Sequence, residues 1–329
     1  MKHFLLLLLF FSFAVTASAN AIDSLKTDND VLKFMLKVDS YLTYKGNPIV
    51  TIAPTDTLLK LLSCNDVARQ WGVKTWQKID FNEDGKTDLL VTLKMSDGFY
   101  VFAFIDKGDD IFNSLRISKG LLFGDNCQIA WPAKIAGKQM LVFYSKTSYV
   151  KGKGSDGQWK SITELKTDTL IYLYDDFIEY NPKVKNYAIK SISINSRPTA
   201  WDGLEYTANI QADGKATYYA SRFKSKNGYF TGTISTDKLN ELKSLLNYIQ
   251  IKKLKDNYQV LWTDDQTVDY EIVFENGTVK KISDYGTIGT FGLRRLYSFL
   301  HDLRLSEYWM PVKFPASIPR AKLPAIKIH

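Results

Sequence analysis

The fold class is decided by the stretch YEIVFENGTVKKIS, residues 270–283, in the C-terminal half of the 329-residue chain. Apolar and polar residues alternate on both sides of Asn276-Gly277. Asn-Gly between two alternating runs is the strongest short-range sequence signal for a β-hairpin. The stretch therefore predicts two antiparallel strands, and the sheet they begin sets the architecture of this half.

The segments around this hairpin predict further strands and two helices. Alternating runs predict strands at 191–195, 204–211, 216–222 and 229–234. Leucines at helical spacing follow Thr236, and a closing helix is expected from Phe291 to Leu303. These elements together predict an antiparallel sheet with both helices on one face.

The N-terminal half is also predicted to be β-rich. Apolar spacing predicts helices at 31–38 and 56–67. Strands are expected at 76–80, 89–95, 99–104, 128–131, 140–144, 169–174 and 177–180, with a mobile loop at 151–157. The fold class expected for the whole chain is therefore α+β, with two domains that each contain an antiparallel sheet and one or two helices.

The first residues have the pattern of a secretory signal peptide. Lys2 and His3 precede an apolar run from Phe4 to Val15, and small residues follow up to Ala21. The run is too short to span a bilayer, and cleavage after Ala19 fits the small-residue rule for signal peptidase, with Ala21 as the alternative. We therefore expect export to a periplasmic or extracellular location and no transmembrane segment after cleavage.

The domain organisation expected from these patterns has four parts. Residues 1–19 form the signal peptide, 20–183 a β-rich domain, 184–309 an α+β domain and 310–329 a tail rich in proline and basic residues. The boundary is placed where apolar patterning pauses around Pro182. Proline density in the tail excludes a regular helix or a central strand there.

The charge, histidine content and cysteine content of the chain exclude several classes of function. The formal net charge is +8, but the lysines are scattered, and in an exported protein this balance does not indicate a nucleic-acid partner. Only three histidines occur, which excludes most Ser-His-Asp mechanisms and most zinc sites. Cys64 and Cys127 are expected to form a disulfide in an oxidising compartment, although two buried free thiols are the alternative.

One segment carries chemistry that the composition does not explain. Residues 80–91 read DFNEDGKTDLLV, with Asp80, Asn82, Asp84 and Asp88 at loop positions one, three, five and nine. Calcium prefers six to eight oxygen ligands, and the carbonyl of Lys86 would supply the ligand at position seven. The sequence predicts a structural calcium site here, with a metal-free acidic turn as the alternative.

This loop resembles the calcium loops of integrin-type propeller repeats, in which a similar acidic pattern runs into a hydrophobic strand. The resemblance covers residues 80–91 only, and a single repeat cannot close a propeller. It therefore implies the ion and not the propeller fold.

A second resemblance covers the C-terminal half. The run from Ser191 to Trp309 is similar to an uncharacterised domain family found in exported proteins of Gram-negative bacteria. The likeness rests on the strand ending at Arg197-Pro198, the turn at Asp213-Gly214, the Thr263-Asp264-Asp265 segment and the turn at Asp284-Tyr285-Gly286. A cysteine-glycine motif that often follows Arg-Pro in that family is replaced here by TAWDG. The resemblance implies fold and compartment and leaves the activity open.

The same half contains the residues expected to bind a ligand. Arg197, Trp201, Asp264, Asp265 and Asp284 are the candidates. Tyrosines on the predicted strands, of which alternation places half on the outer face, would form a surface platform for a glycan or peptide. Two carboxylates facing one sugar would instead indicate a glycoside hydrolase.

Two functions therefore follow from the sequence. The first is a non-catalytic, calcium-stabilised envelope protein that binds a protein or a glycan. The second is a carboxylate-dependent hydrolase of envelope or imported polysaccharide. Scarce histidine and the lack of a nucleophile motif favour the first.

Overall fold

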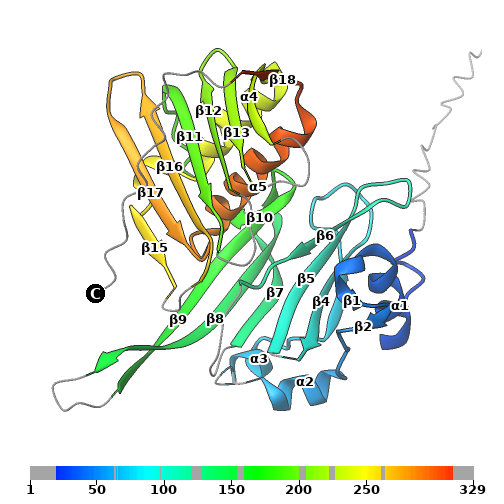
Figure 1. Cartoon of the computed structure of the whole chain (residues 1–329). Helices are drawn as coiled ribbons and strands as arrows, with labels where there is room; N and C mark the ends of the chain where they lie inside the picture. Colours follow the sequence, from blue (N-terminus) through cyan, green and yellow to red (C-terminus); the bar gives the residue numbers. More distant parts are fainter. Residues whose placement is uncertain are drawn as a thin grey trace, which may run out of the picture. The chain divides into compact units, whose positions relative to one another are not determined.

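The computed structural model of the chain is β-rich (Figure 1). It describes residues 20–62, 64, 66–96, 98–119, 127–153, 159–199, 205–221, 227–260 and 264–313. Strands account for 44% of the residues and helices for 22%, arranged with several antiparallel sheets, so the predicted β-rich α+β class is confirmed. The predicted signal peptide and most of the predicted tail lie outside the described residues.

The chain divides into two compact units. The first contains Met1–Ser118 with Lys134–Gln139, and the second contains Lys119–Ala133 with Met140–His329. The domain boundary predicted at 183/184 stays a prediction, because a compact unit is not by itself a domain that folds alone.

The first unit packs a helix on an antiparallel sheet. Its helices are α1 (Asp28–Val38), α2 (Thr55–Leu61) and α3 (Val67–Gln70), with a 3₁₀ turn at Ser40–Leu42 and a short pair β1 (Thr43–Tyr44) and β2 (Asn47–Pro48). The main sheet has the order β3 (Trp76–Ile79), β4 (Asp88–Met95), β5 (Gly98–Asp106) and β6 (Phe112–Arg116). Thr27 and Asp30 form a capping box that starts α1. Phe34 of α1 packs edge-on against Phe104 and Phe112, so the helix covers the sheet through its apolar face.

The second unit contains two sheets. The smaller has the order β10 (Asp176–Glu179), β9 (Trp159–Leu173), β8 (Lys138–Lys153) and β7 (Cys127–Ile135). The larger has the order β15 (Asn257–Gln259), β17 (Val279–Tyr285), β16 (Thr267–Phe274), β11 (Ile189–Arg197), β12 (Tyr206–Gln211), β13 (Lys215–Ala220), β14 (Gly228–Thr233) and β18 (Trp309–Val312). Every pair in the larger sheet is antiparallel except β15 with β17, which is parallel.

Two helices cover one face of the larger sheet, α4 (Thr236–Tyr248) and α5 (Phe291–Ser306), as Figure 1 shows. Tyr206 and Tyr218 are almost fully buried on this face, where Tyr206 meets His301 of α5 and Tyr218 meets Trp309. Because side chains alternate along a strand, the residues next to Tyr206 in β12 and next to Tyr218 in β13 point to the opposite face. This arrangement agrees with the prediction of two helices on one side.

The β10 strand is joined to α5 by its own side chains. Glu179 accepts hydrogen bonds from the backbone nitrogens of Phe291 and Gly292, at 2.6 and 2.9 Å, at the start of α5. Phe143 of β8 packs edge-on against Phe291. A carboxylate at a helix N-terminus satisfies unpaired N–H groups and interacts favourably with the helix dipole. These contacts explain why the smaller sheet belongs to the same compact unit as α5.

The hairpin predicted over 270–283 is present. Tyr270 pairs with Ile282 and Val273 with Val279, and Gly277 takes the left-handed φ of 81° that the turn needs. The disulfide between Cys64 and Cys127 is also present, with both side chains buried.

Several boundaries differ from the prediction. The helix expected at 56–67 is split, since α2 ends at Leu61 and the left-handed φ of Asp66 precedes α3. β8 continues to Lys153, so strand pairing replaces the first part of the loop predicted at 151–157. Pro311 lies in β18, which pairs only with β14 at the sheet edge, where a missing N–H is tolerated.

Candidate functional site

The acidic loop predicted to bind calcium connects β3 to β4. Ile79 pairs with Asp88 at its base, so the loop runs from Asp80 to Thr87 between two paired strands. Glu83 and Gly85 have positive φ angles of 56° and 83°, which fold the loop back on itself. The glycine predicted for the sharp turn therefore has the conformation that this position requires.

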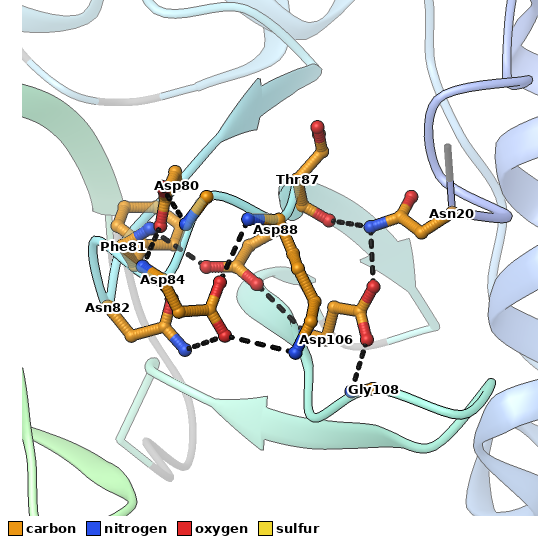
Figure 2. A network of polar contacts seen from close by, with 11 residues as sticks. Asn20, Asp80, Phe81, Asn82, Asp84, Thr87, Asp88, Asp106 and Gly108 are labelled. Carbon is orange, nitrogen blue, oxygen red and sulfur yellow. Dashed lines mark hydrogen bonds and ion pairs between the residues drawn. The ribbon is translucent and has the colours of Figure 1, made fainter. Parts of the chain in front are cut away.

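The acidic side chains of the loop bond to its own backbone (Figure 2). Asp80 accepts hydrogen bonds from the nitrogens of Asp84 and Gly85, at 3.1 and 2.9 Å. Asp84 accepts one from the nitrogen of Lys86 at 2.9 Å and one from the amide of Asn82 at 3.0 Å. The five predicted ligand positions thus lie in one tight turn.

Asp88 is the buried member of the set. Its carboxylate is fully buried and accepts one backbone hydrogen bond from Phe81 and one from Asp106, both at 2.8 Å. Burial raises the pKa of Asp88 to about 7, and the negative charges of Asp80 and Asp84 add to the rise. Among the described residues no cationic side chain forms an ion pair with Asp88.

Lys86 brings a positive charge into the loop. Its amino group lies 3.5 Å from Asp84 and both side chains are partly exposed, so the pair is a weak one. On the other side of the loop, Asn20 donates to the carbonyl of Thr87 at 2.7 Å and to the carboxylate of Asp106 at 2.6 Å. Asn20 therefore holds the backbone next to Asp88 (Figure 2).

The residues of the loop fit calcium by donor type and order. Three carboxylates, one amide oxygen and one carbonyl supply the hard oxygen ligands that calcium prefers. In the part of the chain that the structure describes, no three acidic, histidine or cysteine side chains are gathered as a metal-binding group. The carboxylates of Asp80 and Asp84 would have to exchange their backbone partners for the ion.

The residues predicted to bind a ligand in the second unit each contact a different partner. Arg197 pairs with Asp269 at 2.6 Å, and Trp201 lies outside the described residues. Asp264 is exposed with a left-handed φ of 67°, and Asp265 accepts a hydrogen bond from the nitrogen of Gln266. Such contacts are ordinary for residues in loops and at strand ends.

Asp284 has a different environment. It is 3% exposed, and its carboxylate accepts from the nitrogen of Gly289 at 3.1 Å. Burial raises its pKa to about 6, while the hydrogen bond from Gly289 and the positive charge of Lys119 act in the opposite direction. A Cβ on Gly289 would lie 2.6 Å from the Asp284 carboxylate, so only glycine fits at this close approach.

Lys119 was not predicted from the sequence. Its amino group donates to the carbonyls of Ile288, at 3.3 Å, and Gly289, and lies 4.5 Å from the Phe291 ring centre. Burial lowers the pKa of Lys119 to about 8. No local motif marks this lysine, because its partners are 169 residues and more away along the chain.

A hollow of about 470 Å³ includes Lys119 in its lining. Phe143, Tyr258 and Phe291 line it together with Lys166, which pairs with Asp168 at 2.9 Å. The backbone nitrogens at the start of α5 are already bonded by Glu179 and Thr290. The hollow therefore offers no unsatisfied helix terminus for an anion.

No helix within the described ranges is long and apolar enough to cross a membrane. No curated protein matches the chain, and no solved structure matches it either. One protein-family profile does match, over β11 to β17 and most of α5. The predicted resemblance of this half to an uncharacterised domain family is thereby confirmed, and residues 191–304 match a domain of unknown function, DUF6438.

Proposed function

We propose that this chain is an exported, non-catalytic protein of the cell envelope that calcium stabilises and that binds a protein or glycan partner. The observation that carries the calcium part is Asp88, a fully buried carboxylate next to Asp80 and Asp84. A buried carboxylate without a cation is costly, and a divalent ion between Asp88 and the carboxylates of Asp80 and Asp84 would offset this cost and reduce their mutual repulsion.

The export part of the proposal rests on the N-terminal pattern. Cleavage after Ala19 would make Asn20 the first residue of the mature chain. The Asn20 nitrogen lies 2.9 Å from a carboxylate oxygen of Asp23, so a free ammonium there would form an ion pair. N-terminal sequencing of the protein recovered from the cell envelope is expected to begin at Asn20.

The hydrolase alternative has less support. It needs two carboxyl groups on opposite sides of one sugar. Asp284 is engaged by the Gly289 backbone, whereas Asp265 bonds the nitrogen of its neighbour Gln266, and Asp264 is exposed at a loop position. The non-catalytic reading is therefore the one we propose.

Thermal unfolding tests the calcium part. Calcium at about a hundred times Kd should raise the free energy of unfolding by about 2.7 kcal/mol, because it binds the native state only. A chelator should remove the rise, and Asp88→Asn should abolish it. Asp213→Asn is the matched control, since Asp213 lies in an exposed turn outside the loop.

Calorimetric titration with calcium chloride gives a direct second readout. Heat of binding is expected for the wild type and for Asp213→Asn, and none for Asp88→Asn. A wild type that neither binds calcium nor changes its unfolding midpoint would refute the calcium part.

A further inference from the structure

The larger sheet of the second unit has a face opposite α4 and α5 that no helix among the described residues covers. We call it the open sheet face. Its floor is made by Ser193, Asn195, Thr207, Asn209 and Thr217 of the three central strands. Each of them alternates with residues buried toward the helices, which fixes its direction.

Short side chains make this floor a hollow. Its volume is about 940 Å³, and Asp256 and Asn257 line it near the β15 edge. This volume lies at the upper end of the range of about 300–1,000 Å³ typical of ligand sites. A row of serine, threonine and asparagine between longer side chains is the physical cause of the depression.

Hydrogen bonds connect the polar side chains of the floor. Asn209 donates to the hydroxyl of Ser193 at 2.7 Å and accepts from the amide of Gln211. Asn209 lies opposite both Ser193 and Thr217 in the strand registers. These amide and hydroxyl groups are held in place and can each donate or accept further hydrogen bonds.

The charges at the border of the floor cancel each other. Arg197 pairs with Asp269 at 2.6 Å, and Lys281 pairs with Glu271 at 2.9 Å. Asp269 also accepts a hydrogen bond from Ser283 at 2.7 Å. A polyanion or a strongly charged protein surface would find no net charge of opposite sign here.

Two tyrosines stand at the other border. Tyr219 lies opposite Thr207 in the register of β12 and β13, and it stacks on Tyr229 with ring centres 4.4 Å apart. Both rings are partly exposed. Flat aromatic rings beside fixed amides and hydroxyls suit a ligand that has apolar faces and many hydroxyl groups.

We propose that the open sheet face binds a neutral glycan, with Asn209, Ser193 and Thr217 bonding its hydroxyls and Tyr219 stacking on a sugar ring. A protein partner fits less well, because the centres of protein interfaces are rich in large apolar and aromatic residues, and this floor has none. The inference rests on the partner-binding part of the proposed function and names the surface and the partner class.

Titration calorimetry with cellohexaose, maltohexaose, mannohexaose and chitohexaose tests this proposal. At least one hexasaccharide is expected to bind, and Tyr219→Ala and Asn209→Ala should each weaken it by about tenfold. Thr217→Arg places a long charged side chain on the floor without removing the hydrogen bonds of Asn209, and should abolish binding. Tyr41→Ala, at a tyrosine of the first unit that is 88% exposed, should leave binding unchanged.

Salt dependence separates specific binding from the effect of scattered lysines. Glycan binding should persist in about 1 M sodium chloride, where the Debye length is only about 3 Å. The proposal is overturned if no hexasaccharide binds, if folded Tyr219→Ala and Thr217→Arg variants bind as the wild type does, or if Thr217→Arg instead breaks a dimer of this chain. The calcium shift, measured on the same samples, shows separately whether the first part of the proposed function holds.

Discussion

Asp88, at the start of β4, and Asp284, near the end of β17, are both buried aspartates, and they differ in the charges that surround them. Burial raises the pKa of each carboxyl, to about 7 for Asp88 and to about 6 for Asp284. The neighbours of Asp88 are the acids Asp80 and Asp84, which raise its pKa further. Lys119 acts on Asp284 in the opposite direction, because a positive charge stabilises the carboxylate.

The two sites differ in how the charge of a buried carboxylate is stabilised. At Asp284 the chain supplies its own cation, and the Gly289 backbone links the two groups by bonding the carboxylate through its nitrogen and Lys119 through its oxygen. At Asp88 the neighbouring carboxylates raise the pKa, the backbone hydrogen bonds from Phe81 and Asp106 lower it, and in the proposed function calcium would supply the cation. The predictions below test this difference, from the largest expected effect to the smallest.

Removing the internal cation should have the largest effect. Lys119→Met removes two charge-assisted hydrogen bonds to Ile288 and Gly289 and leaves Asp284 without a nearby positive charge. We expect the free energy of unfolding in urea to fall by about 3 kcal/mol, the order expected for losing such bonds at a buried site. Lys166→Met is the control, since this lysine is exposed and forms a surface ion pair worth about 1 kcal/mol or less. Equal effects of the two substitutions would contradict the special role of Lys119.

The second prediction adds calcium, the cation that we propose binds at Asp88. Calcium at about a hundred times Kd should stabilise the wild type by about 2.7 kcal/mol and should stabilise the Asp284→Asn variant equally, because Asp284 does not belong to the loop. Asp88→Asn should lose this stabilisation, and in the presence of chelator it should be less stable than the wild type by about 1–3 kcal/mol, because its amide nitrogen cannot accept one of the two backbone hydrogen bonds that the carboxylate accepts from Phe81 and Asp106. Calcium that stabilises Asp88→Asn as much as the wild type would break the comparison.

The third prediction concerns the pH dependence at Asp284. Its pKa is raised in the folded state, so between about pH 4 and pH 6 the folded chain holds a proton that the unfolded chain has lost. The stability that this proton contributes is present below about pH 4 and is lost as the pH rises through about 6. The stability difference between wild type and Asp284→Asn should therefore shift by an amount on the order of 2 kcal/mol, against the wild type, from pH 4 to pH 7. Urea unfolding of both proteins at each pH measures it, and a constant difference would contradict the assignment.

Local sequence patterns predicted the elements whose signals are local. The Asn276-Gly277 hairpin, the helices after Thr236 and from Phe291, and the acidic turn at 80–88 depend on residues close together in the chain, and all of them are present. The disulfide followed from there being two cysteines in a chain expected to be exported.

The elements that depend on distant residues could not be predicted in the same way. β15 is three residues long and parallel to β17, and a pattern of three residues carries no periodicity. Lys119 precedes β7, Glu179 ends β10 and Gly289 precedes α5, so they come together only in the folded chain. The same holds for the open sheet face. Within each strand its polar residues look like ordinary outward-facing positions, and only the pairing of the strands brings them together.

The smallest expected effect concerns the support of the acidic loop. Asn20→Ala removes hydrogen bonds to the Thr87 carbonyl, which precedes Asp88, and to the carboxylate of Asp106. The expected loss is about 1 kcal/mol of unfolding free energy, the usual net value of such bonds. Asn47→Ala is the matched control, because the side chain of Asn47 is exposed and its one contact, at 3.5 Å, is long for a hydrogen bond. Because Asn20 holds the backbone beside Asp88, its loss should also weaken calcium binding in the calorimetric titration, whereas Asn47→Ala should not. An Asn20→Ala variant with unchanged calcium affinity would show that calcium binding does not depend on the hydrogen bonds of Asn20. The contrast with Asp284 would then rest on side-chain charge alone.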